Sequence, residues 1–153
     1  MSVTASSSSR GRQVSEEEQL NALVVEIRVL EGTFNELSAR QNLFERALLE
    51  TRAALDALKG LSESNPDEVL VPVGGGVLLR SPPPNAEDVL LNVGANVVVQ
   101  RKRVEAVAFL EGRARELENS IVSLLSQRNQ IAARLEADRQ ALNAIVSRQN
   151  QKN

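Results

Sequence analysis

Residues 69–79 read VLVPVGGGVLL, and residues 89–99 read VLLNVGANVVV. The second stretch repeats the first at an offset of 20 residues, and five residues recur as identities: Val69, Leu70, Val73, Gly74 and Val77. Each copy has a β-branched run, a turn that contains glycine and a second β-branched run, which is the pattern of a β-hairpin. The sequence therefore predicts two successive β-hairpins over residues 66–100, joined by the segment RSPPPN at 80–85.

The runs of both hairpins are almost continuously aliphatic, and strands of this kind are usually buried on both faces. Isolated hairpins are marginal in water, and exposed aliphatic edges aggregate. Pro72 cannot donate a ladder hydrogen bond, so we expect it on an edge strand or at a non-bonded position. The insert is thus predicted to be an oligomerisation platform that partner subunits cover. The residues assigned to assembly are Val69, Val71, Val73, Val77 and Leu79 in the first copy, and Val89, Leu91, Val93, Val97 and Val99 in the second.

The hairpin region is flanked by two segments without proline, residues 14–60 before it and residues 102–150 after it. Both segments have a sustained helical period. Read in steps of three and four, each contains a line of twelve positions of which ten are apolar. A globular helix needs a much shorter apolar line, so the pattern favours a coiled coil. The first line is Leu20, Leu23, Ile27, Leu30, Phe34, Leu37, Gln41, Phe44, Leu48, Thr51, Leu55 and Leu58. The second is Val107, Leu110, Ala114, Leu117, Ile121, Leu124, Arg128, Ile131, Leu135, Asp138, Leu142 and Ile145.

Two apolar lines of equal length on either side of a compact insert predict an antiparallel coiled-coil hairpin, with an arm about 70 Å long at the helical rise. Pairing the outer ends makes the numbers of facing residues add to about 165. That register predicts Asp138 beside Arg28, and Arg128 beside Glu36. A helix pair inside an ordinary bundle is the alternative, but bundle helices rarely keep such a seam for twelve layers.

The predicted fold class is therefore α+β, a long antiparallel coiled-coil hairpin with two β-hairpins inserted between its helices. Residues 1–13, MSVTASSSSRGRQ, are polar and of low complexity, and we expect them to form a disordered tail. Gly60, with Pro66 shortly beyond it, indicates that the first helix ends near residue 60.

The composition argues against catalysis. The chain has 153 residues with no Cys and no His, so it lacks the thiol nucleophile, the commonest general base and the commonest metal ligand. The remaining Ser, Thr and carboxylate residues show no catalytic spacing. Gly74-Gly75-Gly76 runs from strand to strand without a following Gly-Lys-Ser/Thr, so a hairpin turn explains it better than a phosphate loop. We expect no enzyme activity, no metal and no cofactor.

Charge and hydropathy argue against two classes of partner, nucleic acids and membranes. Lys and Arg total 18 against 20 Asp and Glu, a balance that argues against a broad nucleic-acid surface. No apolar run approaches the roughly 18 residues of a transmembrane helix, and the Ser-rich start lacks the apolar core of a signal peptide. The absence of Cys is compatible with a reducing cytosol. We therefore expect a cytoplasmic protein without nucleic-acid or membrane partners.

Apolar residues at the free ends of the predicted arm are candidates for contact with other proteins. Val24, Val25 and Val146 lie off the seam, so we expect them to be exposed without a structural need; ordinary surface valine is the alternative. The full set of candidates is Val14, Leu20, Leu23, Val24, Val25 and Ile27 on the first helix, and Leu142, Ile145 and Val146 on the second.

The order of long helix, two Val-rich hairpins and long helix resembles the α-class subunit of prefoldin, an archaeal and eukaryotic co-chaperone. Residues 69–77 and 89–99 carry the resemblance, and Glu105-Ala106 with the leucine line after it continues the pattern. The resemblance covers residues 14–150. Two hairpins are typical of the α class, because the β class has one.

This resemblance implies a hexamer of two α-class and four β-class subunits, whose hairpins join into a β-barrel body that carries six arms. It also implies that unfolded polypeptides are held at the arm tips without ATP and are passed to a group II chaperonin. The apolar candidates above would then be the client-binding residues. A structural coiled-coil tether is the alternative function. An enzyme-associated arm, such as the tRNA-gripping hairpin of a synthetase, is disfavoured by the acidic balance.

Overall fold

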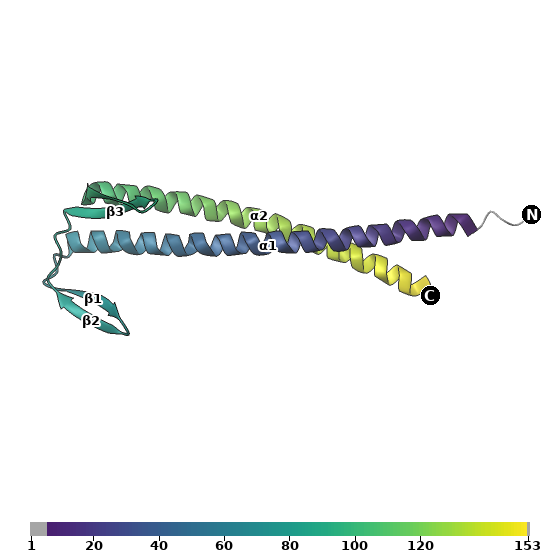
Figure 1. The fold of residues 1–153 in the computed structure, drawn as a ribbon, viewed down its shortest axis with the longest axis horizontal. Coiled ribbons are helices and arrows are strands. Elements are labelled where there is room, and N and C mark those ends of the chain that lie inside the picture. Colours follow the sequence, from purple (N-terminus) through teal and green to yellow (C-terminus); the bar gives the residue numbers. More distant parts are fainter. Residues whose placement is uncertain (1–5, 153) are drawn as a thin grey trace, which may run out of the picture. The chain divides into compact units, whose positions relative to one another are not determined.

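The computed structural model describes residues 6–152, with side chains from Glu16 to Gln151, and contains two long helices separated by two β-hairpins (Figure 1). The predicted fold class is confirmed. The elements are α1 (Ser6–Glu63), β1 (Val69–Gly74), β2 (Val77–Ser81), β3 (Asp88–Gly94), β4 (Val97–Lys102) and α2 (Arg103–Lys152).

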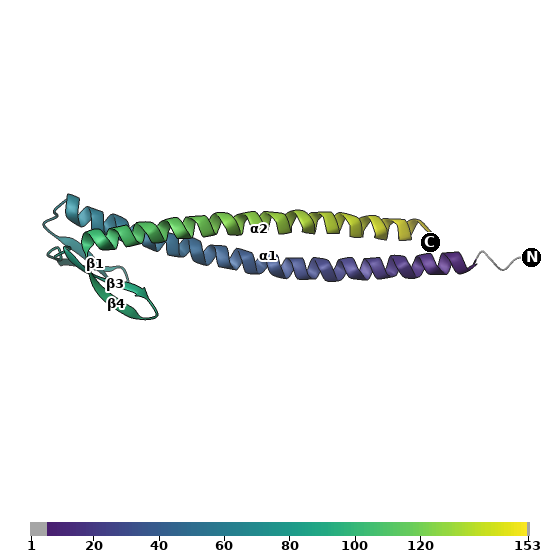
Figure 2. The ribbon, with the colours of Figure 1, turned by 90° about the horizontal axis from the view of Figure 1, so that it is seen from above.

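The chain forms two compact units, and each contains a segment of α1 beside an antiparallel segment of α2. The terminal unit consists of two segments, the described residues up to Asn42 and the described residues from Val122 onward. The hairpin unit comprises residues 43–121 and includes all four strands. Figure 2 shows the two helices running beside each other in both units.

The seam between the helices follows the two apolar lines. Every position of both predicted lines is buried or partly buried, including the polar positions. The most buried apolar residues of the seam are Leu48, Leu55, Ala114, Leu124 and Leu135, each no more than 9% exposed. No large side chain of the described residues is completely enclosed, because a pair of helices covers each seam residue from one side only. Stability is therefore spread over many shallow layers.

Two polar residues are buried in the seam, one in each unit. Thr51 is 6% exposed, and its Oγ1 donates a hydrogen bond of 2.7 Å to the carbonyl of Ala47 within α1. Asp138 is 5% exposed, and its Oδ1 lies 3.2 Å from Nε of Arg134 one turn earlier in α2. The threonine is thus satisfied by its own helix, whereas the aspartate relies on an arginine.

Cross-helix ion pairs report the register of the arm. The residue numbers of these pairs add to 160–170, which brackets the predicted value of about 165. The pairs join Arg52 to Glu118 at 2.6 Å, Lys59 to Glu111 at 3.1 Å, Arg134 to Glu26 at 2.7 Å and Arg139 to Glu31 at 2.7 Å.

The neighbours of the polar seam residues differ from the predicted ones. Asp138 is paired with Arg134 of its own helix and not with Arg28. The guanidinium of Arg128 lies 5.7 Å from the ring centroid of Phe34, where a pairing with Glu36 was expected. A flat guanidinium can stack over an aromatic face, and this lets Arg128 stay beside the seam instead of turning outward to a carboxylate.

The start of α1 corrects the prediction for the N-terminal segment. The helix begins at Ser6, so residues 6–13 are helical where a disordered tail was expected, and the expected start at residue 14 is wrong. Once a helix is nucleated, each further residue adds one backbone hydrogen bond at little cost, so a polar segment can extend a long helix. Residues 1–5 lie outside the described residues.

The end of α1 also differs from the prediction. The helix continues through Gly60 to Glu63, and the N–H of Ser64 donates to the carbonyl of Gly60 at 3.0 Å. Asn65 has a positive φ of 37°, so it and not Gly60 is the left-handed residue that ends the helix, just before Pro66. Asparagine tolerates this conformation better than most residues, which is why a glycine was not needed.

The two hairpins are separate two-stranded antiparallel sheets with the same turn. β1 pairs with β2 and β3 pairs with β4, and each register shifts by one residue just before the turn. The turns themselves are left-handed, at Gly75-Gly76 in the first copy and Ala95-Asn96 in the second. Two consecutive positive φ values are typical of the tight turn that matches strand twist. Pro72 lies in β1, which is an edge strand as predicted.

The start of α2 explains a run of basic residues that does not suit a helix N-terminus. β4 extends to Lys102, so α2 begins at Arg103 and not at 102, and the hairpin region ends two residues later than predicted. Arg101 and Lys102 therefore belong to the strand. Glu105 is the acidic residue in the first turn, and its Oε2 accepts a hydrogen bond of 3.4 Å from the N–H of Lys102.

Adjacent leucines in α1 provide a test of the seam. Leu48 is 9% exposed and Leu49 is 66% exposed. We predict that Leu48→Ala lowers the free energy of unfolding by about 2–4 kcal/mol, because it leaves a cavity in the seam. Leu49→Ala should change it by less than about 0.5 kcal/mol. Urea unfolding of the full chain, followed by circular dichroism, measures both; equal losses would contradict the assignment of the seam.

Candidate functional site

The terminal unit carries the apolar residues that the sequence assigned to the arm ends. Leu20, Leu23, Ile27, Leu142 and Ile145 lie on the seam and are partly buried between the helices. Val24, Val25 and Val146 lie off the seam and are 38%, 61% and 40% exposed, as expected from their spacing. The side chain of Val14 lies outside the described residues. The structure therefore separates the set into seam residues and three exposed valines.

An ion-pair network crosses the helices beside these valines. The guanidinium of Arg134 donates to Oε1 of Glu26 through Nη2 at 2.7 Å and through Nε at 3.1 Å. The same Nε lies 3.2 Å from Oδ1 of Asp138. The hydrogen bond to Glu26, together with the charge of Asp138, raises the pKa of Arg134 above its ordinary value. Arg134 therefore links α2 to α1.

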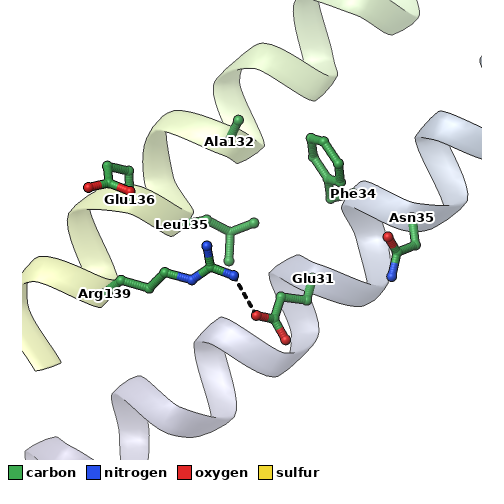
Figure 3. A pocket seen from close by; sticks show the side chains of 7 residues that line it. All are labelled: Glu31, Phe34, Asn35, Ala132, Leu135, Glu136 and Arg139. Atoms are coloured by element: carbon green, nitrogen blue, oxygen red, sulfur yellow. Dashed lines mark hydrogen bonds and ion pairs between the residues drawn. The ribbon is translucent and has the colours of Figure 1, made fainter.

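A shallow pocket of about 400 Å³ lies between the helices of the terminal unit (Figure 3). Phe34 from α1 and Leu135 from α2 form its apolar part. Figure 3 shows Arg139 reaching across from α2 to Glu31 of α1 at the edge of the pocket. The remaining lining residues are Asn35, Ala132 and Glu136. The pocket has room for an apolar side chain of another polypeptide. Its edge is charged, however, so the pocket is a less apolar surface than the exposed valines.

The sequence reasoning missed several exposed apolar residues of the terminal unit. Val29 is 62% exposed on α1, and Val122 and Leu125 are 67% and 39% exposed on α2. Val122 and Leu125 line a groove along α2 with Ser126, Asn129, Gln130 and Ala133. The signal for all three was available, because they are apolar residues off the predicted lines. They lie inward of the helix ends, where the sequence pattern gave no reason to expect a contact surface.

The hairpins present most of their apolar residues to solvent. Of the residues assigned to assembly, six are exposed, with fractions between 43% and 55%: Val71, Val73, Val77, Leu79, Val93 and Val97. Val69, Val89, Leu91 and Val99 are partly buried. In β3 the residues alternate between the two faces of the strand, with Val89 and Leu91 less exposed than Leu90. The chain by itself thus leaves both hairpins without a covering layer.

The opposite faces of the hairpins are also apolar, and these residues were not in the predicted set. Leu70 and Leu78 are 57% and 54% exposed in the first hairpin, and Leu90 and Val98 are 77% and 56% exposed in the second. The sequence signal for them is the continuous aliphatic run, which fills both faces of a strand. Residues facing both ways are therefore available to partners.

The second hairpin is attached to α2 without a linker. Nζ of Lys102 lies 2.7 Å from Oδ1 of Asp88, and this contact raises the pKa of Lys102. The N–H of Arg103 donates to the carbonyl of Glu87 at 2.9 Å, so the first residue of the helix is tied to the residue before β3. The first hairpin has a cross-strand pair between Arg80 and Glu68 at 3.5 Å. These contacts hold each pair of strands in register.

The part of the chain that the structure describes contains neither a metal-binding cluster nor a membrane-spanning helix. Within residues 6–152, no group of three Asp or Glu residues is placed to hold a metal ion. The two groups with raised pKa, Lys102 and Arg134, are both exposed cations in ion pairs. No helix in this range is long and apolar enough to span a membrane.

Comparison with known proteins gives a consistent match. The family model for prefoldin subunits matches residues 17–148. A prefoldin subunit alpha of Nitrosopumilus maritimus is 30% identical over 135 residues, which cover 88% of this chain and 93% of that protein. A prefoldin subunit alpha of Methanoculleus marisnigri is 36% identical over 126 residues, covering 73% of this chain and 85% of that protein.

Among solved structures, a chain of filamentous PFD from Methanocaldococcus jannaschii, determined by cryo-EM, aligns with a TM-score of 0.43 and 25% sequence identity. The alignment covers 78% of this chain and 94% of that chain.

Proposed function

The chain belongs to the prefoldin family, and on that premise we propose that it is the α-class subunit of a cytoplasmic, ATP-independent co-chaperone. In this proposal, two α-class and four β-class subunits form a hexamer, which captures unfolded polypeptides at its arm ends and delivers them to a group II chaperonin. Family membership makes the chain a chaperone-type subunit of an oligomer. The relatives it matches are named as prefoldin subunits and not as enzymes.

The observation that carries the proposal is the exposure of the hairpins. Strands rich in Val and Leu form two-stranded sheets whose faces and outer edges have no covering layer in this chain. Such strands are unstable alone and prone to pair with others, so they fit a subunit that is completed by its partners. Joining hairpins from several subunits would bury these residues and remove the free edges.

Client capture is proposed for the terminal unit. Val24, Val25 and Val146 are exposed apolar groups that the seam does not need. Each would contribute a weak contact to an unfolded chain, because burying one valine is worth only about 1.5–3 kcal/mol before entropy losses. Several arms acting on one client would multiply these contacts. The partly buried seam residues are proposed to contribute less to client binding, because the seam already covers part of each side chain. These residues are Leu20, Leu23, Ile27, Leu142 and Ile145.

A structural tether without client-holding activity is the competing function, because it would need the same arm and the same platform. The exposed valines of the terminal unit offer apolar contacts that a chaperone would use and a tether does not require. Suppression of client aggregation by the assembled complex distinguishes the two functions.

We predict that Val97→Lys together with Val99→Lys prevents assembly. The two positions are two residues apart on β4, and lysine there would carry a charge into a buried interface at a cost of several kcal/mol. Val97 is 51% exposed and Val99 only partly buried in the single chain, so the isolated subunit should keep its helicity. Light scattering after mixing with a β-class subunit measures the assembly.

Leu49→Lys is the control, because it adds a charge at a leucine that is 66% exposed on a helix, outside the hairpins. This control should assemble as the unmodified chain does. An intact hexamer in the hairpin double variant would show that β4 is not part of the platform.

We predict that replacing Val24, Val25 and Val146 by Thr lowers client protection several-fold. Thr has nearly the shape of Val but is polar, so the change removes apolar contact and leaves the seam in place. The measurement is light scattering from a chemically unfolded test protein diluted into buffer with the assembled complex.

The matched control replaces Leu43 and Leu49 by Gln, which removes apolar surface of similar exposure, 64% and 66%, from the hairpin unit. Protection should be unchanged in this control. If the valine variant assembles and protects the client as well as the unmodified complex, the arm ends are not the client-binding surface.

A further inference from the structure

The connection between the helices is not a tight turn, which would set the register of the arm by itself. A tight turn between two helices would fix which residues face each other. Here α1 ends at Glu63 and α2 begins at Arg103, and residues 64–102 form two hairpins with linkers. The seam alone is also a poor guide, because an apolar line that repeats at helical spacing packs almost as well after a shift of one heptad. Side chains must therefore select the register.

The two cross-helix ion pairs of the hairpin unit do not make this selection. Arg52 and Lys59 are seven residues apart on α1, and their partners Glu118 and Glu111 are seven residues apart on α2. A shift of one heptad in one direction brings Lys59 opposite Glu118. The opposite shift brings Arg52 opposite Glu111. One of the two pairs is therefore recovered in either shifted register.

The cross-helix pairs of the terminal unit behave differently. Arg134 is bonded to Glu26 and Arg139 to Glu31. A shift of one heptad in either direction places an uncharged residue opposite each arginine, so both pairs are lost. The residues that would face them are Thr33 or Gln19 opposite Arg134, and Ser38 or Val24 opposite Arg139. Exposed ion pairs are weak, however, so these two alone would select the register only slightly.

Asp138 makes the selection stronger. It is 5% exposed on the seam, and its Oδ2 has no hydrogen-bond partner among the described residues. Its Oδ1 depends on Arg134, which Glu26 holds from the other helix. A buried carboxylate is costly unless a cation is held against it. Thr51, the other buried polar residue of the seam, imposes no such demand, because its hydroxyl bonds within its own helix.

We propose that Asp138 is a positioning residue that sets the antiparallel register of the two helices through Arg134 and Glu26. In the observed register the guanidinium is anchored across the seam and compensates the carboxylate. After a heptad shift Glu26 is gone, and the buried carboxylate faces a different apolar layer with a less constrained arginine. A buried polar group that specifies register at a cost in stability is well documented in coiled coils.

The register matters for the proposed function, on which this consequence rests. A shift of one heptad slides one helix along the other by about 10 Å. Val146 would then move by that distance relative to Val24 and Val25, and one end of the seam would lose its partner residues. The exposed valines proposed to bind clients would then have a different arrangement, even though both helices remained intact.

Engineered cysteine pairs measure the register directly, because the chain has no native Cys. In the full chain, Leu23→Cys with Leu142→Cys reports the observed register, since these numbers add to 165. Leu30→Cys with Leu142→Cys reports a shift of one heptad, and Leu23→Cys with Leu135→Cys reports the opposite shift. Each pair is oxidised mildly, and the disulfide that forms within one chain is counted at monomer mass. Each pair is compared in three backgrounds: unmodified, Asp138→Leu and Thr51→Leu.

The expected result is that only the first pair closes in the unmodified and Thr51→Leu backgrounds. With Asp138→Leu, at least one shifted pair should close about tenfold more than in the unmodified chain, while helicity and melting temperature are kept or raised. A variant that is only less stable would form less of the disulfide between positions 23 and 142 and no shifted disulfide. The measurement therefore distinguishes a residue that sets the register from one that only stabilises the arm. If Asp138→Leu misfolds, Asp138→Ala removes the carboxylate without adding volume and carries the same expectation.

Shifted disulfides that stay at background level in a folded Asp138 variant would overturn the proposal. So would an equal increase with Thr51→Leu, because the effect would then belong to any polar seam residue. No client is used in these measurements. The register role can therefore fail while the complex still protects clients, and it can hold even if the complex protects none.

Discussion

The contact between the apolar lines of α1 and α2 is the interaction on which the rest of the structure depends. A single amphipathic helix of this length has nowhere in water to bury its stripe, and it is stable because an antiparallel partner covers that stripe. The covering is shallow, and even the best-buried leucines, such as Leu124 and Leu135, retain some exposure. The arm therefore gains its stability from length, with each layer adding a little, and its outermost layers can remain partly open.

A seam made in this way leaves the hairpins without a core of their own. The apolar lines of the two helices pack against each other and not against the strands. Most Val and Leu residues of β1 to β4 therefore remain exposed within the chain. The two helices thus cover each other, whereas the hairpins lack a cover within this chain. This division follows from the geometry of two helices, which have one buried face between them and no second face for a sheet.

Three of the four polar residues of the seam show different ways of placing a polar group between helices. Thr51 bonds to the preceding turn of its own helix, and Arg128 stacks over Phe34. Asp138 has no local donor other than an arginine that also serves the opposite helix. The bond of Thr51 lies within one helix and forms in any register, whereas Arg128 stacks on a residue of the opposite helix. Asp138 is compensated by an arginine that Glu26 holds from the opposite helix.

The sequence by itself determined the seam, the two hairpins and their tight turns, because these depend on short-range spacing that the order of residues contains. All twenty-four positions of the two apolar lines, Thr51 and Asp138 included, lie in the interface between the helices. The tertiary structure alone decided where the helices start and end, which residue caps α1, and how Arg128 and Asp138 are compensated. Those outcomes turn on competition between nearly equal alternatives: Asn65 over Gly60 as the left-handed residue, and Phe34 over Glu36 as the neighbour of Arg128. Spacing along a chain cannot rank such alternatives, because their difference lies in distances and angles that exist only once the two helices are side by side.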